Sequence, residues 1–195
     1  TKSFIARYPT YEDIRKYDDS GTYPPPLHCP KNILNTWIPF EASTYTGPYK
    51  KNDEALQFIL KHIQIMCGND TPVGDYMTKW IAQMIQYPAI KTISPTFIGE
   101  QGTGKTSVVK IIECLIGKAK CMETTDPGRD VLGDFNSLML NAFLVNLNEI
   151  SKKDTMEAEG RMKALQTDGK ISINKKGRDQ MMVNSYHRFL ITTNS

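Results

Sequence analysis

Two stretches of the chain carry hydrophobic residues at helical spacing. Residues 53–66 predict a helix whose apolar face consists of Leu56, Ile59, Leu60 and Ile63. A second helix is predicted behind them, with Thr71 as its cap, Pro72 in its first turn and Pro88 at its end. An apolar stripe needs a partner that covers it, so we expect both helices to pack against a core.

From about residue 93 the pattern changes to short hydrophobic runs that alternate with helical segments. Strands are predicted at residues 94–98, 121–124, 142–148 and 188–193. Helices are predicted at residues 105–116, around 131–138 and at 153–166, and residues 170–183 predict a polar β-hairpin. Strands interleaved with helices indicate an α/β fold with a mostly parallel sheet flanked by helices, preceded here by a small, mainly helical N-terminal region.

The first fifty residues show little periodicity and many turn-forming residues, including Pro24, Pro25 and Pro26. They are either an extended proline-rich segment or a small subdomain. The expected division of the chain is therefore residues 1–50 for this segment, 51–90 for a helical N-terminal domain and 91–195 for the α/β core.

Composition narrows the classes of protein without choosing a function. Hydrophobic residues make up 39% and charged residues 23% of the chain, which is typical of a globular protein. No apolar run is long enough to cross a membrane and no signal peptide opens the sequence, so we expect an intracellular protein without a membrane partner. The net charge of +3 is too small to indicate a nucleic-acid partner by itself. The four cysteines form no CxxC pair, which favours reduced thiols and no structural zinc.

Residues 99–106 read Gly-Glu-Gln-Gly-Thr-Gly-Lys-Thr and fit the pattern GxxxxGK[ST] of a phosphate-binding P-loop. Glycines allow consecutive backbone amides to point at phosphates, and the following helix adds the positive end of its dipole. We expect Lys105 to reach the β and γ phosphates of ATP and the Thr106 hydroxyl to bind Mg²⁺. The nucleotide-binding set is Gly99, Glu100, Gln101, Gly102, Thr103, Gly104, Lys105, Thr106 and Ser107. A glycine-rich turn without a ligand is the alternative.

Two polar residues end buried strands and complete the predicted catalytic set of Lys105, Glu149 and Asn194. Glu149 follows the strand at 142–148 and is placed to orient or deprotonate the water that attacks the γ-phosphate. Asn148 can contribute to the Mg²⁺ site through a water, beside Thr106 and Glu149. Asn194 follows the last strand, where an amide can contact the γ-phosphate. The alternatives are that Glu149 merely starts a loop and that Asn194 merely ends a strand.

The hairpin between the acid and the amide is basic at its tip. Lys170, Lys175, Lys176 and Arg178 are candidates for contacts with the phosphate backbone of single-stranded DNA. A solvated hairpin tip is the alternative, because charge alone does not separate the two.

The P-loop, the strand that ends in Glu149, the basic hairpin and the strand that ends in Asn194 together resemble superfamily 3 helicases, a branch of the AAA+ ATPases. The chain is most similar to the helicase half of primase-helicases from large DNA viruses and phages. The similarity extends to residues 23–26, 35–37, 79–88 and 133–136. It implies a homo-oligomeric, hexameric ring that encircles single-stranded DNA and couples ATP hydrolysis to translocation, as part of DNA replication.

The resemblance also implies which parts are changed or lie elsewhere. Asn148 stands where the family often has a second acid, which puts the mode of metal binding in question. The family's arginine finger and last core strand follow the sensor asparagine, so we expect the sequence to be part of a longer chain. Arg188 precedes the sensor and is not a substitute. A primase domain upstream is a further expectation.

Two other functions remain open at this point. A P-loop switch or phosphotransferase would use the triphosphate as a signal or as a phosphoryl donor, but residues 174–177 lack the aspartate of a base-reading NKxD element. A DNA-binding scaffold with a degenerate nucleotide site is the second alternative, and Asn148 keeps it open.

Overall fold

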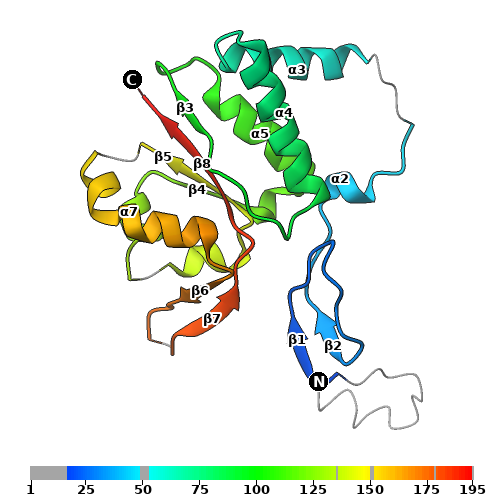
Figure 1. Cartoon of the computed structure of the whole chain (residues 1–195), viewed down its shortest axis with the longest axis vertical. Helices are drawn as coiled ribbons and strands as arrows, with labels where there is room; N and C mark the ends of the chain where they lie inside the picture. The colour runs from blue at the N-terminus through cyan, green and yellow to red at the C-terminus, as the bar shows by residue number, and fades with distance from the viewer. Residues whose placement is uncertain (1–16, 49–52, 135, 150–151, 178, 195) are drawn as a thin grey trace.

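The computed structural model describes residues 17–48, 53–134, 136–149, 152–177 and 179–194. Its centre is a four-stranded sheet with the order β3-β8-β5-β4 (Figure 1). The strands are β3 (Thr96–Ile98), β8 (Arg188–Thr193), β5 (Leu144–Asn148) and β4 (Cys121–Thr124). Each of the three neighbouring pairs is parallel, which confirms the predicted mostly parallel sheet.

Helices cover both faces of this sheet, as the α/β pattern predicts. On one face lie α3 (Glu54–Met66), α4 (Thr71–Gln86) and α5 (Lys105–Ile116), and α7 (Lys152–Thr167) lies on the other (Figure 1). The short helix α2 (Glu41–Thr44) contacts α5. No helix among the described residues is both long enough and apolar enough to span a membrane.

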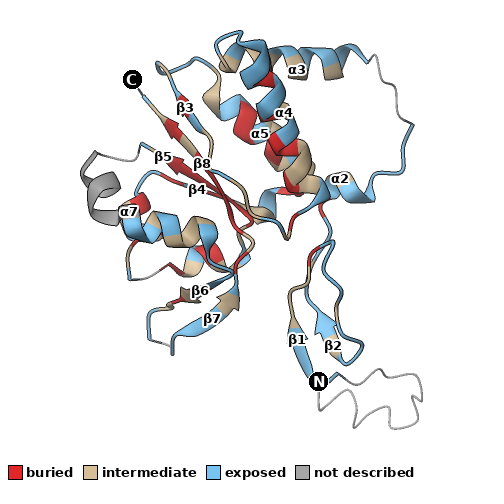
Figure 2. Cartoon of the chain, viewed as in Figure 1, coloured by how far each residue is buried: buried red, intermediate tan, exposed pale blue. Residues whose placement is uncertain are grey.

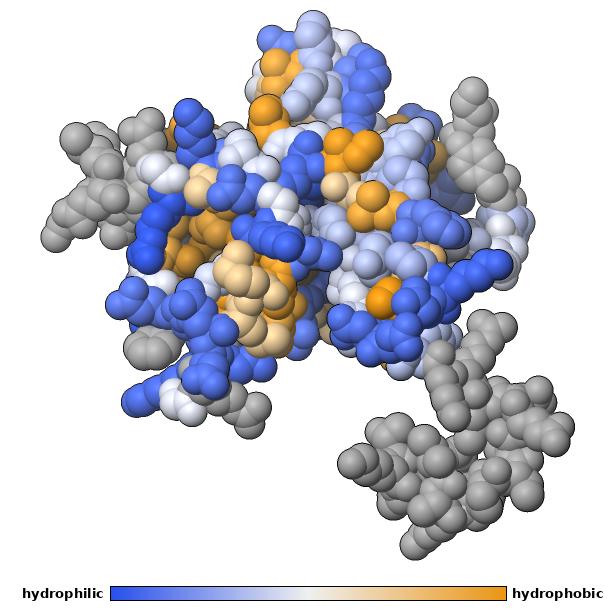
Figure 3. Space-filling view, turned by 60° about the horizontal axis from the view of Figure 1, so that its bottom comes forward, coloured by the Kyte–Doolittle hydropathy of each residue, from blue (hydrophilic) through white to orange (hydrophobic). Residues whose placement is uncertain are grey.

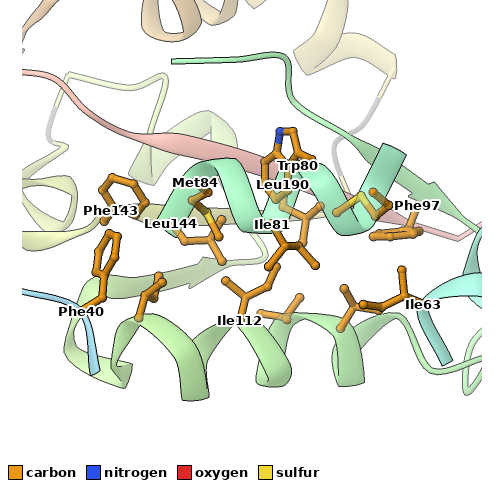
Figure 4. Packing of buried hydrophobic residues seen from close by; sticks show 14 residues of the cluster. Phe40, Ile63, Trp80, Ile81, Met84, Phe97, Ile112, Phe143, Leu144 and Leu190 are labelled. Carbon is orange, nitrogen blue, oxygen red and sulfur yellow. The ribbon is translucent and has the colours of Figure 1, made fainter. Parts of the chain in front are cut away.

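The larger hydrophobic core lies between the sheet and helices α3 to α5. Phe97, Leu144 and Leu190 point from three strands toward Ile81 and Ile112 of α4 and α5 (Figure 4). Leu144, Leu190 and Ile112 are fully buried, and buried residues concentrate along β5, β8, α4 and α5 (Figure 2). Of the stripe predicted on α3, Ile63 is buried in this core and Ile59 packs against it, whereas Leu56 and Leu60 are not part of it. Burial of each large apolar side chain in the core stabilises the fold by about 2 kcal/mol.

A second core covers the opposite face of the sheet. Because side chains alternate along a strand, Val145 and Leu147 of β5 point away from Leu144. They pack with Phe189 and with residues of β6 (Lys170–Ile173), β7 (Met181–Asn184) and the 3₁₀ helix η2 (Ser137–Asn141). Both faces of β5 are therefore buried, which explains why leucine and valine occupy three of its five positions.

Side-chain caps define the starts of α3 and α4. The Asp53 carboxylate accepts a hydrogen bond of 2.8 Å from the backbone N–H of Ala55. The Asp70 carboxylate accepts one of 3.1 Å from the N–H of Val73. The prediction of Thr71 as the cap of α4 is therefore wrong by one residue, because the aspartate before it reaches the free amide first.

The helix predicted around residues 131–138 is also wrong. The chain forms a short helix α6 (Pro127–Asp130) and then the 3₁₀ helix η2 farther on. The Asp126 carboxylate caps α6 by accepting from the N–H of Arg129 at 3.1 Å. Gly133 passes so close to this turn that an added Cβ would lie 2.5 Å from the Arg129 carbonyl oxygen, and the chain bends there instead of continuing a helix.

Two small ribbons lie outside the central sheet. Strands β6 and β7 form the predicted antiparallel hairpin, and β1 (Asp19–Gly21) pairs in parallel with β2 (Ile33–Asn35). An open hollow of about 860 Å³ is lined by both ribbons. Figure 3 shows this side of the molecule, where hydrophobic side chains lie among hydrophilic ones. Ile38 and Met182 are among the exposed hydrophobic residues of the hollow.

A chain of polar side chains ties the base of the hairpin to the sheet. The Lys91 ammonium donates to the carbonyl oxygens of Leu165 (2.8 Å) and Asp168 (2.6 Å) and to the Ser185 hydroxyl (2.7 Å). Nδ1 of His187 lies 3.0 Å from the same hydroxyl, and Nε2 lies 2.8 Å from the Met139 carbonyl oxygen. A carbonyl only accepts, so Nε2 carries the proton and Nδ1 accepts from Ser185.

This arrangement predicts acid sensitivity. Burial lowers the pKa of His187 from 6.5 to about 4, so the folded protein binds fewer protons than the unfolded chain between those values. The stability is complete above about pH 6.5 and is lost as the pH falls toward 4, by up to about 3 kcal/mol. Chemical unfolding of wild type and His187→Gln at a series of pH values measures this. The variant's stability should fall less over this range, and parallel curves would contradict the assignment.

Candidate functional site

The polar residues singled out in the sequence meet at the carboxyl edge of the parallel sheet. The loop between β3 and α5 surrounds a cavity of about 420 Å³ together with the residues that follow β4, β5 and β8. Its lining consists of residues 101–106, Thr125, residues 148–149 and residues 192–194. Of the predicted nucleotide-binding set, Gly99, Glu100 and Ser107 do not line this cavity.

The loop 99–104 has the backbone that its glycines predict. Gly102 and Gly104 have φ of 83° and 101°, a left-handed conformation that other residues adopt only with strain. Gly104 also has no room for a side chain, since an added Cβ would lie 2.8 Å from Cε1 of His62 on α3. Nε2 of His62 lies 3.3 Å from the Gly104 carbonyl oxygen. Helix α3 thereby contacts the loop directly at the N-terminus of α5.

Lys105, Asn194 and Glu149 form a hydrogen-bonded chain across the cavity. The Lys105 ammonium donates to the carbonyl oxygen of Glu100 at 2.8 Å, to that of Gly99, and to Oδ1 of Asn194 at 3.2 Å. Nδ2 of Asn194 donates to Oε1 of Glu149 at 2.7 Å. One amide therefore bridges the cation of the loop and the carboxylate at the end of β5. A group that displaces the Asn194 amide would remove a hydrogen bond from the Lys105 ammonium and from the Glu149 carboxylate.

The backbone at Glu149 turns sharply to place this carboxylate. Its φ is 56°, in the left-handed region where a residue with a Cβ is strained by about 1 kcal/mol or more. Its N–H donates to the Thr192 carbonyl oxygen at 2.9 Å, so the strand pairing with β8 holds the turn in place. The strand end and the exposed carboxylate are thus fixed relative to Asn194.

The residues at this edge fit a magnesium-bound nucleoside triphosphate. The glycine backbone leaves the cavity free of side chains at two loop positions, and one ammonium group faces it. The Thr106 hydroxyl, in the first turn of α5, and the Glu149 carboxylate are hard oxygen ligands of the kind that Mg²⁺ prefers. Asn148 also lines the cavity, and its side chain is held by neighbours on both adjacent strands.

The predicted DNA-contacting lysines lie away from this cavity. Lys170 starts β6 and is exposed, whereas Lys175 and Lys176 lie at the hairpin turn, half-buried and exposed respectively. Arg178 lies outside the described residues. Lys175 lines an open hollow together with Asp134 and Asp179, so the hairpin tip carries acidic as well as basic side chains.

Several residues of the site had no prediction from the sequence. Thr125, Thr192 and Thr193 line the cavity, and Glu123 of β4 accepts a hydrogen bond from Nδ2 of Asn148. Asn146 donates to Oδ1 of Asn148 at 2.8 Å. The sequence carried one usable signal, because asparagines two positions apart in a hydrophobic strand must share a face. The partner strands of that face were not readable from the sequence.

Comparison with known proteins finds similarity to a phage DNA primase-polymerase and to solved structures of the NrS-1 C-terminal region. The chain is 30% identical over 118 residues to the DNA primase-polymerase of Nitratiruptor phage NrS-1, a match that covers 59% of this chain and 16% of that protein. A solved apo structure of the NrS-1 C-terminal region covers the whole chain with a TM-score of 0.73 and 21% identity, and a second, the A form, gives 0.70 over 98%.

These likenesses agree with the predicted resemblance to a phage replication protein, since the curated relative is a phage primase-polymerase, and the solved structures support the predicted fold. The chain spans about half the length of the solved C-terminal region and a smaller part of the curated relative. The protein family described as a family of unknown function (DUF5906) matches residues 97–195, which is half of the chain and includes all of the central sheet except the first residue of β3. The chain therefore belongs to the DUF5906 family.

Proposed function

We propose that the chain is the ATPase core of a superfamily 3 DNA helicase, which hydrolyses ATP to move along single-stranded DNA during phage or viral replication. The observation that carries the proposal is the convergence of Lys105, Asn194 and Glu149, from three segments of the chain, on one glycine-lined cavity. A phosphate-binding loop alone is compatible with many functions. A carboxylate and an amide held beside its lysine are suited to hydrolysis.

Each of these residues has a distinct role in the proposal. Lys105 neutralises charge on the β and γ phosphates, while Thr106 and Glu149 bind Mg²⁺ and Asn148 lies beside them in the metal site. The bound Mg²⁺ would supply charge neutralisation at the phosphates. Glu149 holds the attacking water and accepts its proton. Asn194 bridges Lys105 and Glu149, so it is placed to respond when a γ-phosphate arrives or leaves.

The proposed partners follow from the hairpin and from the resemblance. Lys170, Lys175, Lys176 and Arg178 would contact the phosphate backbone of single-stranded DNA inside a homo-hexameric ring, with an upstream primase domain in the full-length protein. In this proposal residues 1–50 and 51–90 form the segments ahead of the ATPase core at 91–195. An intracellular location, in the host cytoplasm or nucleus, is part of the same proposal.

A scaffold with a degenerate nucleotide site is the second candidate, and one observation favours it. Residue 148, on the strand that leads into Glu149, is an amide where an acid would bind the metal directly. A scaffold would bind DNA and nucleotide without turnover, so hydrolysis separates the two candidates.

The first prediction concerns nucleotide binding and turnover in the full-length protein. Lys105→Ala removes the loop's ammonium group and should weaken ATP binding by a factor on the order of 100. Glu149→Gln keeps the shape of the side chain but removes the base, so binding should persist while the hydrolysis rate falls by roughly a hundredfold or more. Fluorescent-nucleotide titration and phosphate release, each with and without single-stranded DNA, measure both effects.

Lys110→Ala is the matched control for this pair, because Lys110 is exposed on the same helix and away from the cavity. It should behave as wild type. Stimulation of wild-type hydrolysis by single-stranded DNA is expected. Tight ATP binding without turnover, with or without DNA, would refute the helicase and favour the scaffold. Full turnover by Glu149→Gln would remove Glu149 from the catalytic role.

The second prediction concerns the hairpin. Replacing both Lys175 and Lys176 with Ala should weaken single-stranded DNA binding. It should also reduce the slope of log K against log salt by about 1 to 2, because each lost phosphate contact lowers the number of counterions that binding releases. Lys61→Ala with Lys118→Ala, two exposed lysines elsewhere, controls for the lost net charge. Equal slopes in the two double variants, measured by fluorescence anisotropy, would assign the hairpin to the solvated surface.

A further inference from the structure

Four polar side chains form a network on the sheet face that leads to the nucleotide cavity. Strand register places Glu123 of β4 beside Asn146 of β5, and Asn148 of β5 beside Thr192 of β8. Asn146 and Thr192 are buried, with 2% and 6% of their surfaces exposed, while Glu123 is exposed at the rim. Three adjacent strands thus contribute one connected polar cluster within an otherwise apolar face.

The network uses every acceptor position of the Asn148 side chain. Its Oδ1 accepts from Nδ2 of Asn146 at 2.8 Å and from the Thr192 hydroxyl, so both lone pairs of the oxygen are used. The single Thr192 proton has a second acceptor in Oδ1 of Asn146, but that oxygen lies farther away, at 3.4 Å. Its Nδ2 donates to Oε1 of Glu123. An ionised carboxylate only accepts, so Glu123 determines which end of the amide faces β4. Without the Glu123 carboxylate, the contact toward β4 would not fix the orientation of the Asn148 amide.

This arrangement matters for a metal-bound water. A water that binds Mg²⁺ gives its lone pair to the metal and presents only donors to the protein. Asn148 has no free acceptor in this network, whereas the Glu123 carboxylate has a second oxygen with no partner among the described residues. Glu123 does not itself line the cavity, so its carboxylate adds an acceptor and a negative charge next to the site, beside Asn148.

We propose that Glu123 is a positioning residue for the magnesium-bound nucleotide: acting through Asn148, it supplies from strand β4 the negative charge that position 148 lacks. The inference rests on the proposed nucleotide site and adds a residue to it. It also gives the amide at position 148 a role other than loss of function, because it donates to the acid on the neighbouring strand.

The test is a Mg²⁺ titration of nucleotide affinity in the full-length protein, with a non-hydrolysable ATP analogue as the probe. Glu123→Gln is nearly isosteric and removes the charge. It should raise the Mg²⁺ concentration for half-maximal binding about tenfold, the size expected for loss of a group that supports metal ligands. Affinity for the analogue without Mg²⁺ should stay within about twofold of wild type. A purely structural role would lower both affinities together.

A double variant makes the test sharper. Glu123→Gln combined with Asn148→Asp exchanges the carboxylate and the amide between the two strands, so the hydrogen bond and the total charge are kept. Its Mg²⁺ requirement should return to within about threefold of wild type. Glu54→Gln, at an exposed position at the start of α3, is the control for loss of a carboxylate and should leave the requirement unchanged.

The outcomes separate this inference from the proposed function. A wild-type protein that binds no analogue at any Mg²⁺ concentration would refute both. Normal wild-type binding with an unchanged Mg²⁺ requirement in Glu123→Gln would refute the role of Glu123 alone. The role of Glu123 would also be refuted if the double variant folds, as judged by its thermal unfolding midpoint, but its Mg²⁺ requirement does not return toward that of wild type. If the double variant does not fold, the comparison of Glu123→Gln with Glu54→Gln decides.

Discussion

The position of β8 between β3 and β5 is the constraint on which the site depends. Its parallel pairing aligns Thr193 with Ile98 and Thr192 with Asn148, so the three strands end side by side. The loop after β3, the acid after β5 and the amide after β8 then share one edge of the sheet. A shift of one residue in this register would turn every side chain of β8 to the other face and separate Asn194 from Lys105 and Glu149. Sheet pairing, more than any single contact, creates the cavity.

The opposite end of β8 is anchored just as firmly. The Arg188 guanidinium is buried, lies 5.7 Å from the centre of the Phe143 ring, and donates to the Tyr87 carbonyl oxygen at 3.3 Å. Burial lowers the pKa of Arg188 to about 10, which leaves it charged at neutral pH. This cation belongs to the core, in agreement with the expectation that it does not serve as an arginine finger. Lys91 holds the hairpin base next to it, so one strand joins the hairpin to the nucleotide edge.

The sequence predicted those parts of the fold whose signal is local. The bounds of α5, β4 and β8 agree with prediction, and α5 lies between two glycines of positive φ, Gly104 and Gly117. The helix expected around 131–138 was wrong because helical spacing there competes with the Asp126 cap and the crowded turn at Gly133. The P-loop was readable as a motif, and the roles of Lys105, Glu149 and Asn194 stay predictions. Glu123 was not readable, because its significance depends on which strand lies beside β5.

That dependence explains why a single missing acid is poor grounds for calling a nucleotide site degenerate. In a parallel sheet, positions on neighbouring strands are within hydrogen-bond reach while lying more than twenty residues apart in the chain, as Glu123 and Asn148 do. A charge can therefore move sideways across the sheet without leaving the site, provided that the vacated position keeps a donor for the carboxylate. Asparagine meets that condition, and a hydrophobic residue would not. The acidic residues of such a nucleotide site are better judged from two neighbouring strands together, as with Glu123 and Asn148, than from the sequence of one strand.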